Sequence, residues 1–273
     1  MKHKHLLIMS AAVLFTAVSH AQDQQQKMKP EETEFYSPVP KVVTPGKTCG
    51  AAPSDAIALF DGKNLDQWED AQDTTKPAEW KVANGILTVD KTKGNIRTKQ
   101  SFMDYQLHIE WKEPKTLTGS GQARGNSGLF LASLGSGDAG YELQILDSYN
   151  NPTYVNGQAA SLYKQSPPLV NASFPNDVWQ TYDVVWTAPR FNGDGTVKTP
   201  AYATVFHNGV LVQDHTALLG PTQYIGSPAY RQAHGASPIK LQAHGDKSEP
   251  LSFRNIWIRE LQERQPIDST SRK

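Results

Sequence analysis

Short stretches in which apolar and polar residues alternate recur from about residue 57 to residue 261. Residues 105–111 (YQLHIEW) and 141–146 (YELQIL) alternate with a period of two, which is typical of a β-strand with one buried face. Asn84-Gly85 and Asn208-Gly209 follow such stretches and predict tight hairpin turns. No convincing helical period exceeds two turns. The pattern predicts a strand entered from a turn at 125–130 and further strands at 80–82, 86–89, 105–111, 141–146, 181–186, 201–206, 239–243 and 253–261.

Many short strands separated by turns favour an all-β sandwich or jelly roll. The tryptophans on these strands are expected in the core, namely Trp80, Trp111, Trp186 and Trp257. His207 flanks a hairpin turn and is expected to be solvated. Loops longer than about 12–15 residues are uncommon unless they are functional, so the long segments 113–126, 147–176 and 219–237 are predicted to form walls around a site.

The N-terminus has the pattern of a secretory signal peptide. Lys2 and Lys4 precede an apolar stretch, 6–18, and small residues stand around a predicted cut after Ala21. A membrane-spanning helix needs about 20 apolar residues, so this stretch is too short and no membrane span is expected. We predict a signal peptide at 1–21, a flexible linker at 22–54, one domain at 55–262 and a polar tail at 263–273. The mature protein is therefore expected in the periplasm, the cell envelope or the medium.

Charge and cysteine content narrow the possible partners. The 27 basic and 27 acidic side chains give a formal net charge of zero, whereas a nucleic-acid-binding surface needs a basic excess. Cys49 is the single cysteine, so the chain has no internal disulfide. Its neighbours indicate a loop thiol rather than a nucleophile, which would need an adjacent base.

The strand around residues 140–147 carries the most informative polar residues. Alternation places Glu142 and Gln144 on the face opposite Tyr141, and a bulge would bring Asp147 to the same face. Such a face suits a sugar, but a solvated outer face of a sandwich would have the same pattern. The spacing Glu-x-Gln-x-x-Asp is similar to the Glu-x-Asp-x-x-Glu strand of jelly-roll retaining β-glucanases, which need two carboxylates about 5–5.5 Å apart. Gln144 replaces the middle carboxylate and weakens that parallel.

Five motifs together carry a resemblance to a known family: LFDGKNLDQW (59–68), NSGLF (126–130), GYELQILD (140–147), LQAHG (241–245) and FRNIWIREL (253–261). In this order they resemble the 3-keto-disaccharide hydrolase family over roughly residues 55–262. The resemblance implies a concanavalin- or laminarinase-like jelly roll. It also implies a substrate, a glycoside whose sugar carries a ketone at C3.

A ketone at C3 makes the hydrogen on C2 acidic, so one base can start an elimination that expels the group on C1. The chemistry needs a base near C2, a donor near the C3 oxygen and an acid near the glycosidic oxygen. Glu142 is predicted as the base or acid. His244, where a strand ends at Gly245, is predicted to transfer a proton, although a surface histidine capping a turn would look the same. Lys164 is predicted to polarise the ketone, with a solvated lysine as the alternative.

The remaining candidates are expected to contact substrate. Asn126 and Gln144 suit sugar hydroxyls, and the ring of Tyr163 could stack on a sugar face. His234 could line the site from its long loop. Asp147 could instead position His244 or Lys164 or hold a loop. Arg254 could pair with a buried carboxylate rather than with substrate.

The sequence offers no His-x-His or Cys/His spacing for zinc, so no cofactor is expected, although a calcium site built from oxygen ligands stays open. The predicted partner is a small-molecule or oligosaccharide substrate, and the oligomeric state is unassigned. Two alternatives to cleavage of a 3-keto-glycoside remain: a non-catalytic, lectin-like binding module and an ordinary retaining glycosidase.

Overall fold

The computed structural model describes residues 29–262 and residue 266. It contains two units, one formed by residues 43–262 and one that includes the described residues 29–42 and 266. The smaller unit contains one 3-10 turn, η1 (Pro30–Thr33). The predicted signal peptide and all but residue 266 of the predicted tail lie outside the described residues.

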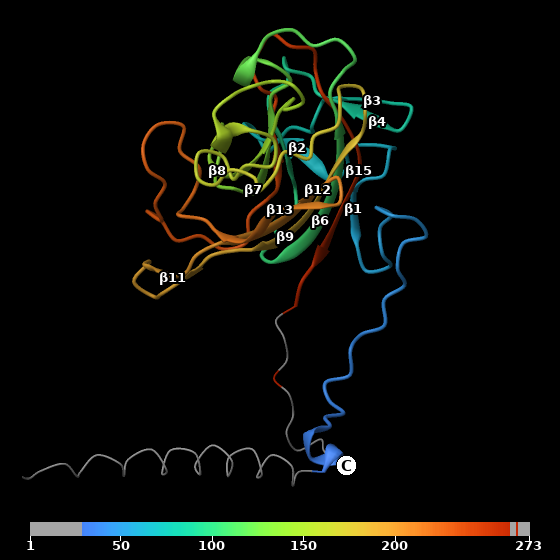
Figure 1. Cartoon of the computed structure of the whole chain (residues 1–273), viewed down its shortest axis with the longest axis vertical. Helices are drawn as coiled ribbons and strands as arrows, with labels where there is room; N and C mark the ends of the chain where they lie inside the picture. Colours follow the sequence, from blue (N-terminus) through green and yellow to red (C-terminus); the bar gives the residue numbers. More distant parts are fainter. Residues whose placement is uncertain (1–28, 263–265, 267–273) are drawn as a thin grey trace, which may run out of the picture. The chain divides into compact units, whose positions relative to one another are not determined.

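Residues 43–262 fold into two antiparallel sheets that face each other (Figure 1). The larger sheet has eight strands in the order β13-β12-β9-β6-β15-β4-β3, with β1 also paired to β15. Its strands are β1 (Ile57–Phe60), β3 (Lys81–Ala83), β4 (Ile86–Thr88), β6 (Tyr105–Lys112), β9 (Gln180–Thr187), β12 (Tyr202–His207), β13 (Val210–Ala217) and β15 (Ser252–Glu260).

The smaller sheet has five strands in the order β2-β5-β14-β7-β8. These are β2 (Trp68–Asp70), β5 (Ile96–Thr98), β14 (Lys240–Leu241), β7 (Ser127–Ser133) and β8 (Gly140–Ile145). A ribbon of β10 (Arg190–Phe191) and β11 (Val197–Thr199) and the 3-10 turns η2 (Gly121–Ala123) and η3 (Val155–Gly157) complete this unit. The described residues contain no α-helix, and the sandwich confirms the predicted all-β class.

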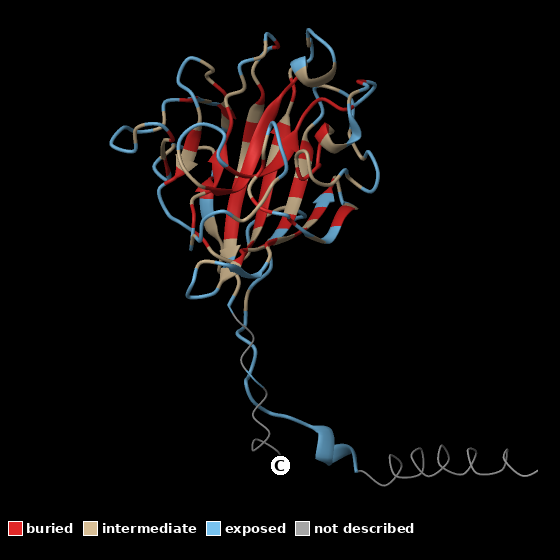
Figure 2. Ribbon diagram, turned by 90° about the vertical axis from the view of Figure 1, so that its left-hand side faces the viewer, coloured by how far each residue is buried: buried red, intermediate tan, exposed pale blue. Residues whose placement is uncertain are grey.

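The core lies between the sheets, where buried positions form a continuous layer (Figure 2). Trp80, Trp111 and Trp186 belong to this core as expected, whereas Trp257 is buried outside it, where its ring stacks on His108. Two buried tyrosines also connect the sheets: Tyr105 donates to the carbonyl of Leu131 (2.6 Å), and Tyr182 donates to that of Gln144 (2.8 Å). Because a buried hydroxyl without a partner is costly, these bonds fix the distance between the sheets beside β8.

The predicted solvation of His207 is wrong. Its side chain is buried, because the register of β12 directs it inward. There the ring packs against Trp111 and Tyr182, and Nε2 lies 3.2 Å from Gln180 Oε1. Burial lowers the pKa of His207 to about 3, so it is a neutral core residue.

Residues 43–54, which the sequence analysis placed in a flexible linker, lie against β15. The carbonyl of Gly50 accepts hydrogen bonds from Asn255 (2.9 Å) and Trp257 (2.8 Å). A Cβ on Gly50 would stand 3.0 Å from the His108 ring, and the backbone φ of Gly50 is +79°. This close approach explains the glycine at position 50.

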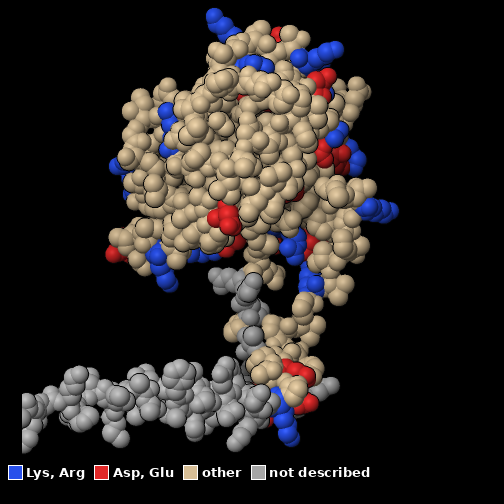
Figure 3. Space-filling view, in the orientation of Figure 1, with Lys and Arg blue, Asp and Glu red and all other residues tan. Residues whose placement is uncertain are grey.

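The surface and the helix content bear on the predicted partners. On the face shown in Figure 3, Lys and Arg are interspersed with Asp and Glu, and no broad basic area forms. Among residues 29–262, no helix has the length and apolar character needed to cross a bilayer.

Candidate active site

Two of the polar candidates, Glu142 and Gln144 of β8, lie on the outer face of the smaller sheet, away from the core. Strand pairing aligns them in two rows: Lys240, Phe130 and Glu142 stand side by side on β14, β7 and β8, and Gly128 pairs with Gln144 in the next row. Gln242 extends that row, since its N–H donates to the carbonyl of Gly128 (2.9 Å). Period-two alternation therefore places the candidate residues of β8 as the sequence predicted.

Gly128 of β7 lies next to the side chains of Glu142 and Gln242. A Cβ at this position would stand 2.6 Å from Glu142 Oε1 and 3.3 Å from Gln242 Oε1. Any side chain on β7 here would displace the carboxyl group. The glycine of the NSGLF motif thus leaves the space that Glu142 occupies.

Glu142 is buried, with 6% of its surface exposed. Burial, reinforced by the nearby Asp138 charge and partly opposed by Lys240, raises the pKa of Glu142 to about 8. The carboxyl group is therefore protonated at neutral pH. A buried neutral carboxyl of this kind can donate a proton in a reaction.

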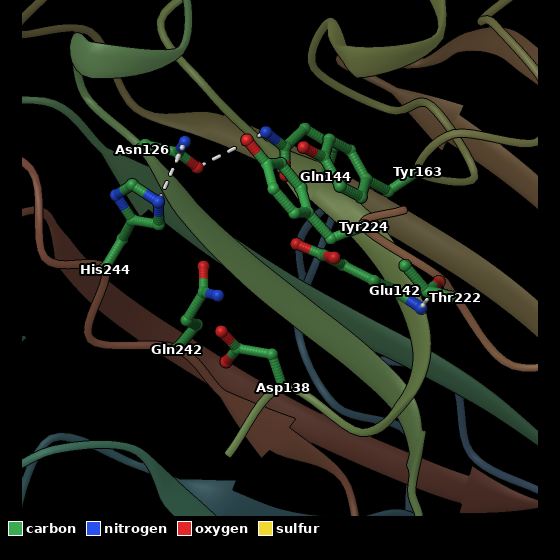
Figure 4. Close-up of a pocket in the computed structure, with 9 residues that line it drawn as sticks. All are labelled: Asn126, Asp138, Glu142, Gln144, Tyr163, Thr222, Tyr224, Gln242 and His244. Atoms are coloured by element: carbon green, nitrogen blue, oxygen red, sulfur yellow. Dashed lines mark hydrogen bonds between the residues drawn. The ribbon is translucent and has the colours of Figure 1, made fainter. Parts of the chain in front are cut away.

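A chain of side-chain contacts joins Glu142 to His244 (Figure 4). Glu142 Oε1 lies 3.1 Å from the Gln144 amide group, whose nitrogen lies 3.3 Å from Asn126 Oδ1. Asn126 Nδ2 in turn lies 3.4 Å from His244 Nε2. A protonated Glu142 can donate to the Gln144 oxygen, and an ionised one can accept from its nitrogen once the amide turns over.

His244 has a carboxylate behind it. Nδ1 faces Asp246 Oδ2 at 3.4 Å and the backbone N–H of Asp246 at 3.2 Å. Burial opposes ionisation of Asp246, but hydrogen bonds from His244, Lys91 and Ser248 hold its pKa well below the ordinary value. Where the Asp246 N–H donates to Nδ1, the ring proton is on Nε2. In the other tautomer the Nδ1 proton points towards the ionised Asp246 Oδ2, and the Nε2 lone pair can accept a proton.

The site consists of two connected spaces. The inner chamber, about 140 Å³, is lined by Glu142, Gln144, Gln242, Asp138 and Thr222. The outer chamber, about 510 Å³, is lined by Gln122, Ala123, Tyr154, Lys164, Gly245 and Asp246. The two share Asn126, Tyr163, Tyr224 and His244. Each of the three long loops supplies part of this lining.

Segment 160–164 covers the free edge of β8 and carries Tyr163 and Lys164 to the site. Tyr163 N–H donates to the carbonyl of Glu142 (3.0 Å), and Ala160 N–H donates to that of Gln144 (3.0 Å). On the same strand, Glu142 N–H donates to Thr222 Oγ1 (3.0 Å). The loop residues are therefore positioned by the backbone of β8.

Three predicted site residues lie outside both chambers. Asp147 follows β8, pairs with Arg124 (2.6 Å) and accepts from the N–H of Tyr149, so it holds loops. Arg254 lies on β15 in the other sheet, where it pairs with Glu110 (2.6 Å).

His234 is the third of these residues. It contacts the Tyr141 hydroxyl through Nε2 (2.8 Å), and Tyr141 belongs to the core. This places His234 behind β8 rather than in front of it.

The sequence analysis did not single out several residues of the site. Gln242 has a buried Oε1 that lacks a hydrogen-bond partner within residues 29–262, as expected of a group reserved for a ligand. Lys240 is fully buried, and its Nζ donates to the carbonyls of Gly137 (2.5 Å) and Ala139 (2.9 Å). It thereby fixes the loop that carries Asp138. Asp246 stands two residues beyond His244, a spacing that could have drawn attention to it.

Among the described residues, no group of three or more His, Cys, Asp or Glu side chains is arranged to hold a metal ion. The expectation that no cofactor takes part stays a prediction.

The fold and the site together define a jelly-roll sandwich with a buried carboxyl group and an imidazole ring facing one polar cavity. Residues 55–259 match the model of the 3-keto-alpha-glucoside-1,2-lyase-like domain. The chain belongs to this family, which confirms the resemblance drawn from its motifs. No match was found among curated proteins.

Solved structures agree with this assignment. A "putative glycosyl hydrolase" from Parabacteroides distasonis ATCC 8503 is 54% identical, with a TM-score of 0.79, over 86% of this chain and 97% of its own. Another structure with the same description and source is 19% identical, with a TM-score of 0.53, over 76% of this chain and 99% of its own. At that identity the second similarity shows the fold alone.

Proposed function

We propose that this protein cleaves the glycosidic bond of 3-keto-glycosides by base-initiated elimination, with His244 as the base and Glu142 as the acid. The observation that carries the proposal is that the buried carboxyl group of Glu142 and the ring of His244 line the same inner chamber. Glu142 is held neutral by burial, while His244 stands beside the ionised Asp246. One acid and one base facing the same cavity suit an elimination next to a ketone.

The proposed step is balanced as follows. His244 Nε2 takes the proton from C2, the C1–O bond breaks as a C1–C2 double bond forms, and Glu142 gives its proton to the departing oxygen. The free Oε1 of Gln242 can accept from a sugar hydroxyl. One Asn126 N–H is donated to the carbonyl of Gln122, and the other, which faces His244 Nε2 at 3.4 Å, can turn to the C3 oxygen, where charge develops. Addition of water across the new double bond would complete a net hydrolysis.

The test uses a 3-keto-glucoside of a chromogenic phenol. Release of the phenol should fall about 10²–10⁴-fold in Glu142→Gln and in His244→Ala, the range for removal of a general acid or base. His215→Ala is the matched control, because His215 is exposed and lines neither chamber. Equal release by all four proteins would refute the proposal.

The same reaction in D₂O separates elimination from direct displacement. Elimination followed by addition of water places deuterium on C2 of the product sugar, whereas displacement retains the original hydrogen there. Dialysis against EDTA before the assay tests the predicted absence of a metal requirement.

A second candidate function, cleavage of ordinary glycosides, is favoured by one observation. Asp138 lines the inner chamber together with Glu142 and raises its pKa, and a neutral acid beside an ionised carboxylate is the usual glycosidase pair. Turnover of unoxidised glucosides that is lost in Asp138→Asn would establish this function. We expect no such turnover.

We also propose that the protein is exported, on the basis of the N-terminal signal pattern. Mass spectrometry of the protein recovered from the periplasm or medium should find a mature N-terminus at Gln22. Replacing Leu14 in the apolar stretch with Arg should retain the protein in the cytoplasm. A mature protein that keeps residues 1–21 would contradict this proposal.

A further inference from the structure

The outer chamber contains a lysine surrounded by aromatic rings. Lys164 Nζ lies 4.4 Å from the ring centroid of Tyr154, 5.4 Å from that of Tyr224 and 5.9 Å from that of Tyr163. The hydroxyls of Tyr154 and Tyr163 are 2.6 Å apart, which joins the two rings into one wall. Contacts of this kind hold a cation in place without neutralising its charge.

The charge of Lys164 has no opposite partner. Within residues 29–262 it forms no ion pair, although ten other lysine and arginine side chains there do. The carboxylate that lines the same chamber, Asp246, is compensated by Lys91 at 2.6 Å. The outer chamber therefore presents one unpaired positive charge beside three tyrosine rings.

Backbone geometry keeps Lys164 at this place. Its N–H donates to the carbonyl of Asn156 (2.8 Å), and its φ is +62°. A non-glycine residue in this conformation is strained and persists only where its surroundings enforce it. Lys164 also lines the outer chamber but not the inner one, so it faces a different part of a ligand than Glu142 does.

We propose that the outer chamber binds the leaving group and selects a ring that carries a carboxylate. The tyrosine rings would contact the faces of that ring, and the Lys164 ammonium would pair with its carboxylate. An aromatic acid and a uronic acid share this chemistry. The inference rests on the proposed function for placing the keto-sugar in the inner chamber, but the charge preference itself can be measured by binding alone.

The test compares two ligands that differ only in charge. They are the 3-keto-glucosides of 4-hydroxyphenylacetic acid and of its amide, in which the methylene group keeps the leaving ability of the two phenols nearly equal. Calorimetric titration of Glu142→Gln measures their binding without turnover, and titration of the wild type with the unoxidised glucosides repeats the comparison without a ketone. A glucuronic-acid-linked disaccharide and its amide form a second pair that distinguishes the sugar source from the aromatic one.

The acid should bind about fivefold more tightly than the amide, as expected for a partly exposed charge pair. In the Lys164→Gln background the affinities for the acid and the amide should differ by no more than about twofold. The fivefold difference should persist in Lys99→Gln and become smaller at high salt. Lys99 is the matched control because it is exposed and lines neither chamber. Tyr224→Ala should weaken both ligands equally.

The inference would be overturned if the acid and the amide bound with equal affinity, or if Lys164→Gln left the difference in affinity unchanged. Failure of all the ligands to bind would overturn it as well. Failure of the proposed function gives a different result, namely binding with the charge preference but no release of the phenol by the wild type.

Discussion

Replacing Glu142 with glutamine should make the folded protein less sensitive to alkaline pH. Burial raises the pKa of this carboxyl from 4.5 to about 8, so the folded protein binds more protons than the unfolded chain between these values. Its contribution to stability is complete below about pH 4.5 and is lost as the pH rises towards 8. One pKa unit corresponds to about 1.36 kcal/mol, so a shift of about 3.5 units corresponds to a full loss of at most about 5 kcal/mol.

Glutamine carries no charge at any pH in this range, so the variant does not lose this stability as the pH rises. Relative to wild type, Glu142→Gln should have similar stability at about pH 5 and should be more stable at about pH 9, by on the order of 2–4 kcal/mol. Urea unfolding of both proteins at each pH measures the difference. A stability difference that does not grow with pH would show that Glu142 is not a buried neutral acid.

Glu113 provides a matched control for this experiment. Burial also raises its pKa to about 8, and it lines neither chamber. Glu113→Gln should therefore change the pH dependence of stability in the same direction. Only Glu142→Gln should abolish the activity, which in the wild type should fall above about pH 8 as the acid loses its proton.

Three further substitutions test residues that we expect to position the side chains and loops of the site. Asp246→Asn should lower kcat/KM about 10–100-fold, the usual cost of removing a carboxylate behind a histidine, and should leave KM little changed; a proportionate rise in KM would contradict its positioning role. Gly128→Ala should displace Glu142, so activity should fall at least about tenfold while the thermal transition shifts little; unchanged activity would show that the carboxyl needs no such space. Lys240→Met should lower the free energy of unfolding by about 1–3 kcal/mol, because two buried carbonyls lose their donor, and an unfolding curve identical to that of the wild type would contradict this.

The strand pattern predicted the part of the site that depends on alternation. Glu142 and Gln144 share a face because a strand has a period of two, and the hairpin at Asn84-Gly85 joins β3 and β4. β14 is only two residues long, too short for a period to show. Lys240 of this strand and Gln242 just after it join the site through pairing with β7, and this pairing cannot be derived from local sequence.

Asp138 escaped the sequence analysis for a different reason, whereas Tyr224 was expected as one of several loop tyrosines that could stack on a sugar. Both residues lie in segments without periodicity, and their positions depend on contacts made far along the chain. Tyr224 follows Thr222, which is bound to β8, and Asp138 lies between carbonyls that Lys240 holds. His207 shows the opposite failure: its position beside a turn indicated solvent, but the register of β12 buries it.

The division of acid and base at the site follows from the number of donors around each carboxylate. Asp246 is buried but receives hydrogen bonds from Lys91, Ser248 and the backbone of Asn126, so it stays ionised and can stabilise a protonated His244. Glu142 is buried with the Gln144 amide as the one side-chain hydrogen-bonding group beside its carboxyl among the described residues, so it stays neutral. Burial alone would protonate both groups. The fold separates their roles by supplying donors to one carboxylate and withholding them from the other.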